Sequence, residues 1–279
     1  MHAPSGIARC VDISAERSPS GPFGSGIPDW RDSEAYDWLD GADPLFWAWE
    51  WLRRDPDYRH EALANPPQRI RDRFGTIDEQ RAASKWGLHA FEDPRRSWDA
   101  RPLWLPCRDK SVLHAKAIKP RAERGIFALE ELQDIVTLGV AEEECRLLLC
   151  DGLSAVRLDV EGHEVLASQV SLQFEICGFE AARQHVRTWE RLAHLIRGQL
   201  LPPLSFSGVN ARRRQLLLLR TFDALAEGAS QRQIAAELIR PEAAIRRWRS
   251  VNPSLRSQAQ RLVKGARTYA QGRFWSLLE

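Results

Sequence analysis

The chain of 279 residues is 43% apolar and 28% charged, a composition typical of a globular protein with roughly two domains. No stretch reaches the roughly 18 apolar residues of a transmembrane helix, and the first 27 residues lack the apolar segment of a signal peptide. The five cysteines are scattered without a C-x-x-C pair, which argues against a disulfide framework or a zinc site. We therefore expect a cytoplasmic protein that binds no membrane, metal or other cofactor.

The net charge of +2 is unevenly distributed along the chain. From Ser205 to the end, thirteen Arg and one Lys stand against five acidic residues, which gives +9. The preceding 204 residues therefore carry −7. Such asymmetry indicates that the C-terminal part has an anionic partner.

The N-terminal residues 1–27 are predicted to be a disordered tail. Gly, Pro and Ser make up thirteen of the twenty-five residues from 4 to 28. A Trp-rich helical module with its connector follows at 28–110, and five of the eleven Trp lie within 30–51. Residues 86–106 are rich in Pro and Trp without a clear period, which indicates that the connector is extended.

A short helix is predicted at the centre of the Trp-rich module. Asp43-Pro44 is typical of a helix start, with the aspartate as cap, and Asp55-Pro56 is typical of a helix end. The apolar side chains cover an arc of about 200° on a helical projection. A surface helix needs an apolar stripe of only about 100° or somewhat more. We therefore expect this helix to contact two apolar neighbours.

Two interpretations of those neighbours stay open. Both belong to the same chain, or one is a protein partner that docks on the aromatic side chains, since Trp is enriched at binding hot spots. Phe46 falls on the polar arc, so a polar replacement there is expected to spare folding and weaken partner binding. The candidate partner-binding residues are Phe46, Trp47, Trp49 and Trp51.

Residues 111–200 are predicted to form a small antiparallel β-sheet with a covering helix. Apolar and polar residues alternate strictly at 156–160 and 170–176, and the apolar run 146–150 predicts a third strand. After Gly178 the period becomes helical, and Gly198 is a stop signal. The expected apolar face of this helix consists of Phe179, Ala182, Val186, Trp189, Ala193 and Ile196.

Residues 201–279 are predicted to form an all-α module of the helix-turn-helix type, so the fold class is α+β. The first helix is expected at about 210–227, and the second begins with the capping box SQRQ at 230–233. The third is expected from 253 or 254 to about 270. The intervening residues 240–252 are too many for a simple turn, so a short extra helix is expected there.

The two faces of the third helix differ in chemistry. Its apolar residues fall within an arc of about 120°, and the opposite arc of about 140° contains no acidic residue. Arg and Lys bind phosphate or guanine, Gln binds adenine, and Ser or Thr binds either base. The polar face therefore predicts DNA contact. Its residues are Arg256, Ser257, Gln260, Arg261, Lys264, Arg267 and Thr268.

Other cationic residues of this module are candidate phosphate ligands. Three consecutive arginines lie in the expected first turn of the first helix, where each cation opposes the helix dipole by about 0.3–1 kcal/mol. A bound phosphate would explain that arrangement, although simple solvation is an equal alternative. The candidates are Arg212, Arg213, Arg214, Arg232, Arg246 and Arg247.

No motif for catalysis is recognisable. The seven His show no metal-ligand spacing, and no Gly-rich phosphate loop is present. The run Glu142-Glu143-Glu144 is consecutive, so its carboxylates cannot share one helical face. We therefore expect no catalytic residue and no enzymatic activity.

Both terminal modules resemble one known family, the FseA-type transcriptional activators of excision genes on integrative and conjugative elements of proteobacteria. The N-terminal resemblance rests on PDWRDSEAYDWLDGADPLFWAWEWLRRDPDYR followed by WGL, EDP and WLP. The C-terminal resemblance rests on ARRRQLLLLRTFDALAEGASQRQIAAELI, then Trp248, Leu255-Arg256 and Arg261-Leu262-Val263. Together, the two resemblances cover about residues 28–106 and 185–279.

The resemblance implies a transcriptional activator that binds double-stranded promoter DNA upstream of excision-factor genes. RNA polymerase and a small antiactivator protein are the protein partners that it implies. It also keeps an alternative open, because the C-terminal module occurs alone in antiactivators and could act by protein contact without DNA. The acid-free helix face and the two-module arrangement favour the DNA-binding activator.

Overall fold

The computed structural model describes most of the chain from residue 26 onward. The later residues that it does not describe are 68–76, 79, 121–124, 133–135, 142, 177, 203, 205–207 and 242–252. The predicted disordered tail therefore lies, up to residue 25, outside the described residues. The extra helix expected within 240–252, with Arg246 and Arg247, also lies outside them.

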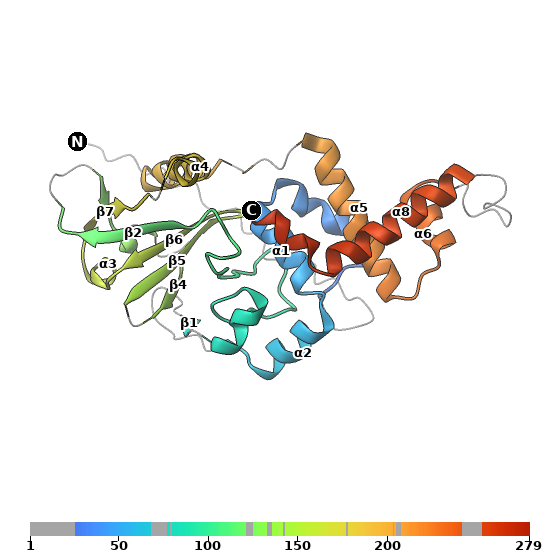
Figure 1. Ribbon diagram of the computed structural model, residues 1–279, viewed down its shortest axis with the longest axis horizontal. Coiled ribbons are helices and arrows are strands. Elements are labelled where there is room, and N and C mark those ends of the chain that lie inside the picture. Colours follow the sequence, from blue (N-terminus) through green and yellow to red (C-terminus); the bar gives the residue numbers. More distant parts are fainter. Residues whose placement is uncertain are drawn as a thin grey trace, which may run out of the picture.

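The Trp-rich module is helical, and the expected helix at its centre is confirmed. This helix begins at Pro44, directly after Asp43, and ends before Asp55-Pro56, which opens the next helix. Figure 1 shows the central helix between the sheet and the C-terminal helices. The helices of the module are η1 (Glu34–Gly41, a 3-10 helix), α1 (Pro44–Leu52), α2 (Pro56–Ala64) and η2 (Arg81–Trp86, a 3-10 helix).

Asp43 joins this module to the rest of the chain. It occupies the N-cap position of α1 as expected, but its side chain makes no cap hydrogen bond. Its carboxylate is fully buried and accepts hydrogen bonds from the backbone N–H groups of Ala155 (2.7 Å) and Leu204 (2.9 Å). Arg191 pairs with the same carboxylate. A buried carboxylate requires such donors because it has lost its water, and three distant segments supply them.

A mixed β-sheet lies beside the module. Within the described residues it has seven strands in the order β1-β4-β5-β6-β2-β7-β3. The pairs β1/β4 and β2/β6 are parallel, and the other four pairs are antiparallel. The strands are β1 (Ile77–Asp78), β2 (Leu113–Ile118), β3 (Ile126–Phe127), β4 (Val136–Val140), β5 (Glu144–Asp151), β6 (Ser154–Glu161) and β7 (Val170–Phe174).

The α+β class is confirmed, and the three expected strands correspond to β5, β6 and β7. The sheet is larger than expected and is not antiparallel throughout. β2, which follows the connector, pairs with both β6 and β7 and so separates them. Two short helices, η3 (Leu129–Leu132) and α3 (Glu164–Ala167), lie in the connections. Alternation of residues identifies a strand but not its neighbour, so this order could not be predicted locally.

Both faces of the sheet are covered. On one face, Leu158 of β6 shares a core with Leu192 and Leu195 of α4 (Phe179–Ile196). On the other face, Leu148 and Cys150 of β5 belong to the core of the Trp-rich module. The core of the Trp-rich module and the core beneath α4 therefore lie against opposite faces of the sheet, and the Arg191–Asp43 ion pair links α4 to the residue that precedes α1.

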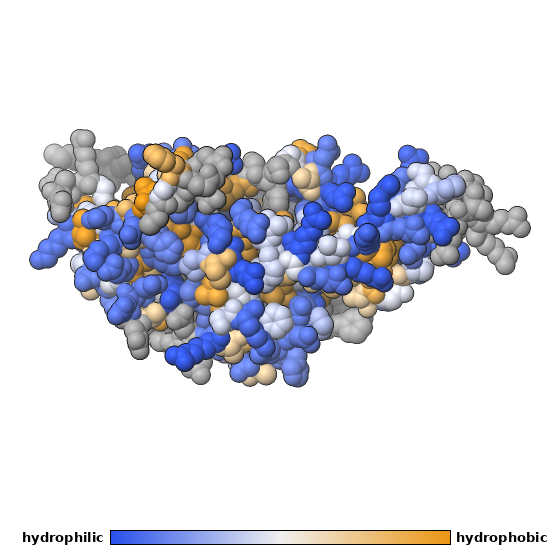
Figure 2. Space-filling view, in the orientation of Figure 1, coloured by the Kyte–Doolittle hydropathy of each residue, from blue (hydrophilic) through white to orange (hydrophobic). Residues whose placement is uncertain are grey.

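The helix expected to cover the sheet is present as α4, but the apolar face expected from its sequence packs only in part: Trp189 packs against the sheet core and contacts Phe174 of β7. Phe179 is 97% exposed and Val186 is 45% exposed, whereas Leu192 and Leu195 are buried. Apolar surface is visible over α4 in Figure 2. The ion pair between Arg191 and the buried Asp43 explains this rotation, because it holds Arg191 on the inner side of the helix.

Three helices expected in the C-terminal module are present. The capping box at the start of the second is confirmed, since Ser230 and Gln233 exchange side-chain-to-backbone hydrogen bonds. A final 3-10 turn returns the chain to α1. The elements are α5 (Gly208–Ala226), α6 (Gln231–Leu238), α8 (Pro253–Ala270) and η5 (Arg273–Leu277).

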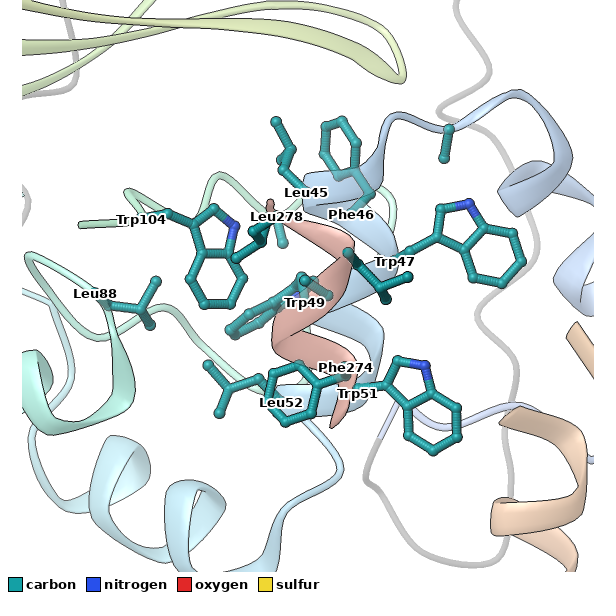
Figure 3. Packing of buried hydrophobic residues seen from close by; sticks show 14 of the residues in the cluster. Leu45, Phe46, Trp47, Trp49, Trp51, Leu52, Leu88, Trp104, Phe274 and Leu278 are labelled. Carbon is teal, nitrogen blue, oxygen red and sulfur yellow. The ribbon is translucent and has the colours of Figure 1, made fainter. Parts of the chain in front are cut away.

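One aromatic core joins the two terminal modules. Trp47, Trp49 and Trp51 of α1 are at most 2% exposed, and they share this core with residues of β5, α5 and η5. Figure 3 shows side chains of α1 close to Phe274 and Leu278 from the C-terminal end. The interpretation that both apolar neighbours of α1 lie in the same chain is thus confirmed, and the core crosses the domain boundaries expected at 110 and 201.

The inference that Phe46 faces solvent because it lies on the polar arc is wrong, since Phe46 is fully buried, as are Trp47, Trp49 and Trp51. The four candidate partner-binding side chains therefore present no docking face in this structure. Helical projection placed Phe46 beside Glu50 and the following arginines, and the structure buries that entire arc as well. Segments distant in the sequence cover this arc, and a helical projection considers only the residues of the helix itself.

Replacement of Phe46 by Ser is expected to lower the free energy of unfolding by roughly 3–5 kcal/mol, because it removes a buried ring and leaves a cavity. Urea denaturation followed by Trp fluorescence measures the change. The matched control is Phe179→Ser, where the same substitution falls on an exposed ring. That variant is expected to stay within about 0.5 kcal/mol of the wild type. Equal stability of both variants would contradict the burial of Phe46.

Candidate nucleic-acid interface

The polar face of α8 is an exposed cationic surface. Its charged members make no ion pair with a carboxylate of the described residues, and the side chains along α8 give a hydrophilic surface in Figure 2. Thr268 differs from the others because it is half-buried and its hydroxyl donates to the carbonyl of Lys264 (2.9 Å). The exposed members are Arg256, Ser257, Gln260, Arg261, Lys264 and Arg267.

The apolar face of α8 orients this surface toward solvent. Leu255 and Ala259 pack against Ala235 of α6, and Val263 packs with Ala224 of α5 and Trp30. Burial of these small and branched side chains on three partners sets the rotation of α8 about its axis. The opposite face is therefore exposed along the length of the helix.

α5 and α8 cross closely at Gly265. A Cβ atom at this position would lie 2.7 Å from Cδ2 of Leu218, which is nearer than van der Waals contact permits. Leu218 itself is 1% exposed and belongs to the aromatic core. The absence of a side chain at Gly265 therefore allows α8 to pack closely against Leu218 of α5.

The three arginines of α5 have separate roles. The helix begins at Gly208, so Arg212, Arg213 and Arg214 lie in its second turn, and the expected opposition to the helix dipole in the first turn does not apply. Arg212 donates through Nη1 to the carbonyl of Asp40 (3.0 Å) and so binds η1. Arg213 and Arg214 are exposed without an ion pair to the described residues, so they can contact phosphate.

Other arginines of the C-terminal module differ in exposure and partners. Arg232 on α6 is exposed. Arg220 is 8% exposed and donates to the backbone carbonyls of Trp30 and Arg31, so it has a structural role. Arg273, which the sequence analysis did not select, is exposed with its guanidinium 5.7 Å from the ring centroid of Tyr269. Its position directly after α8 is the signal that could have identified it.

A buried ionic network holds α5 against α1. Arg54 donates to both oxygens of Asp223 on α5, at 2.7 and 2.9 Å, and also pairs with Glu50. Arg53 donates to the two oxygens of Glu50 at 2.6 and 2.8 Å. Tyr36 donates its hydroxyl to Asp223 at 2.7 Å. The Glu50–Arg54 ion pair is therefore part of the interior.

Burial and charge together set the protonation of this network. Burial raises the pKa of Glu50, but the charges of Arg53 and Arg54 and their hydrogen bonds outweigh it and hold the pKa at about 2. Burial is also the main reason that the pKa of Tyr36 is raised, with the Asp223 charge acting in the same direction. Glu50 is thus ionised and Tyr36 is a neutral hydrogen-bond donor at neutral pH.

Neither a cluster of metal-ligating side chains nor a bilayer-spanning helix occurs in the described part of the chain. Its His, Cys, Asp and Glu residues form no group of three or more that could hold a metal ion. Its helices include none that is both long enough and apolar enough to span a bilayer.

Comparison with known proteins gives two domain matches. Residues 176–279 match a family described as T6SS, Transcription factor, DNA binding domain, and residues 29–89 match the proteobacterial transcriptional regulator-like domain. No curated protein matches the chain. The cationic face of α8 lies within the first match and α1 within the second. The two matches support a DNA-binding transcriptional regulator, a class of protein that is usually not enzymatic.

Replacement of Arg54 by Met is expected to lower the free energy of unfolding by about 3–5 kcal/mol, since it leaves Asp223 and Glu50 buried without their partner. The matched control is Arg95→Met, because Arg95 is exposed and pairs with Asp93 at the surface. An exposed pair contributes about 0–1 kcal/mol, so this variant is expected to be nearly as stable as the wild type. Comparable losses in the two variants would argue against the buried network.

The stability difference between the wild type and Glu50→Gln is expected to depend on pH. Because the pKa of Glu50 is lower in the folded state than its ordinary value of 4.5, its stabilising effect is complete above about pH 5. The effect is lost as pH falls toward 2, by about 3 kcal/mol in all. Urea denaturation of both proteins between pH 6 and pH 3 measures this. A constant difference over that interval would contradict the assignment.

Proposed function

We propose that this protein is a transcriptional activator that binds double-stranded promoter DNA through the cationic face of α8. The exposed, acid-free character of that face is the observation that carries the proposal. A solvated helix face ordinarily mixes both signs of charge, whereas phosphate binding requires cations without competing carboxylates. The match of residues 176–279 to a DNA-binding domain supports the same conclusion.

The composition of the α8 face suggests how contacts divide. Arg256, Arg261, Lys264 and Arg267 can neutralise phosphates, and an Arg can also bind guanine. Gln260, exposed between them, can form two hydrogen bonds with adenine. Arg213, Arg214 and Arg232 lie on the neighbouring helices α5 and α6 and can add phosphate contacts.

The proposed target genes are the excision and transfer genes of an integrative and conjugative element, as the resemblance of both modules to FseA-type activators implies. RNA polymerase and a small antiactivator protein are the proposed protein partners. These proteins would contact surfaces other than the aromatic residues of α1, which are buried. Footprinting on the promoters of the element, with α8 variants in parallel, tests the choice of genes.

Binding to random duplex DNA is expected to be strongly salt-dependent. With six to ten phosphate contacts, the affinity should fall by about 10³–10⁵ between 50 and 200 mM salt. Joint replacement of Arg256, Arg261, Lys264 and Arg267 by Ala should lower the slope of log K against log salt by about 3.6. Fluorescence anisotropy with a labelled duplex measures both quantities.

The matched control for this variant replaces four exposed cations elsewhere, with the same change in net charge: Lys85, Arg95, Lys116 and Arg197, each to Ala. It should keep the wild-type slope. A protein that fails to bind duplex DNA at 50 mM salt would favour the alternative, an antiactivator-like module that acts through protein contact. Equal loss of slope in both variants would show that binding follows net charge and not the α8 face.

A further inference from the structure

A cavity of about 580 Å³ lies where α1, β6, α4 and the C-terminal residues meet. This volume falls within the range of small-molecule sites, which is about 300–1,000 Å³. The DNA-contact face of α8 contributes no residue to it. The apolar residues that line it are Pro44, Leu45, Val186, Leu204, Leu277 and Leu278. Figure 3 shows two of them, Leu45 and Leu278, close together.

Two exposed cations line the same cavity. Lys110 and Arg187 have no carboxylate partner among the described residues. The backbone of Lys110 is held in place, since its N–H donates to the carbonyl of Leu278 (3.1 Å) and its carbonyl lies 3.1 Å from Nε2 of His185. The backbone of Lys110 is therefore fixed by two hydrogen bonds, and Arg187 lies on α4.

Two of the three acidic residues in the lining, Asp43 and Asp109, are buried. Asp43 is fully buried and bonded to Ala155, Leu204 and Arg191, as described above. Asp109 is 3% exposed, and its Oδ1 accepts hydrogen bonds from the N–H and hydroxyl of Ser111. Its Oδ2 is buried and has no hydrogen-bond partner among the described residues. Glu279 is the exposed acid of the lining.

We propose that this cavity binds a small amphipathic anion. Its carboxylate, sulfonate or phosphate group lies between Lys110 and Arg187, and its hydrocarbon part packs against the leucines of the wall. Unpaired cations at the mouth of an apolar cavity favour this chemistry, because the anion gains two charged partners while the apolar part leaves water.

The position of the cavity connects it to the proposed DNA interface. Leu277 and Leu278 lie at the end of η5, the 3-10 turn that follows α8, so a bound molecule would touch the segment next to the cationic helix and not α8 itself. An effect of the molecule on DNA affinity rests on the proposed function. Binding itself does not, and it is measured without DNA.

The test is a fluorescence titration of the full chain with 8-anilinonaphthalene-1-sulfonate, an aryl sulfonate with an apolar body. The wild type should show one saturable site. Joint replacement of Lys110 and Arg187 by Ala should raise the dissociation constant about tenfold, because two charge contacts are lost. Glu279→Gln should lower the dissociation constant about two- to threefold, because it removes a negative charge that repels the anionic dye.

Two controls separate the cavity from other sites. Joint replacement of Lys119 and Arg197 by Ala removes two exposed cations outside the lining and should leave binding unchanged. Phe179→Ser removes the most exposed ring of α4 and should also leave it unchanged. Circular dichroism and urea midpoints confirm that each variant is folded.

Loss of binding in Phe179→Ser, with binding retained in the Lys110/Arg187 variant, would place the dye on the surface of α4 and overturn the proposal. Equal weakening in the two double variants would overturn it as well, since binding would then follow net charge. Affinity for duplex DNA, measured on the same samples, reports the proposed function separately. A protein that binds the dye in the cavity but not DNA would retain this inference and refute the activator.

Discussion

The buried pairing of Arg54 with Asp223 is the interaction on which the arrangement of the molecule depends. These two charges have lost their water, so each is tolerated only while the other, together with Glu50 and Tyr36, remains in place. The network joins α1, in the regulator-like match, to α5, in the DNA-binding match. Separation of the two parts would expose or strand buried charges. The Trp-rich module is therefore a structural support for the helices that carry the candidate interface.

The concentration of Trp in so short a segment follows from this supporting role. The nine-residue helix α1 contacts several segments at once, and large rings on different sides of the helix reach different partners. Trp49 meets Tyr58 within the module, whereas Trp51 meets Phe222 of α5 and Tyr269 of α8. Trp30 extends this contact further, because its ring lies in the core of the C-terminal helices and donates to Glu227.

The same packing separates the arginines of the C-terminal part into two groups. Arg212 and Arg220 bond to backbone carbonyls of the N-terminal module and hold the parts together. The arginines of α8 remain in solvent because the opposite face of that helix is committed to α5, α6 and Trp30. Net charge alone indicates an anionic partner, but only the pairing pattern shows which cations are available to it. The candidate interface is thus a consequence of how the core is closed.

The sequence by itself determined the features that depend on neighbouring residues. Asp43-Pro44 marks the start of α1, Ser230 and Gln233 form a capping box, and the period of α8 places its cations on one face. Tertiary structure alone decided which polar groups are buried. Phe46 and Glu50 lie on an arc of α1 that a helical projection predicts to be exposed to solvent, yet both are buried. Arg54, on the same side, is buried against Asp223, which lies 169 residues away in the sequence. The strand order around β2 and the rotation of α4 were decided in the same way. Periodicity records the two sides of an element, whereas the partner on each side comes from distant segments whose contacts leave no local pattern.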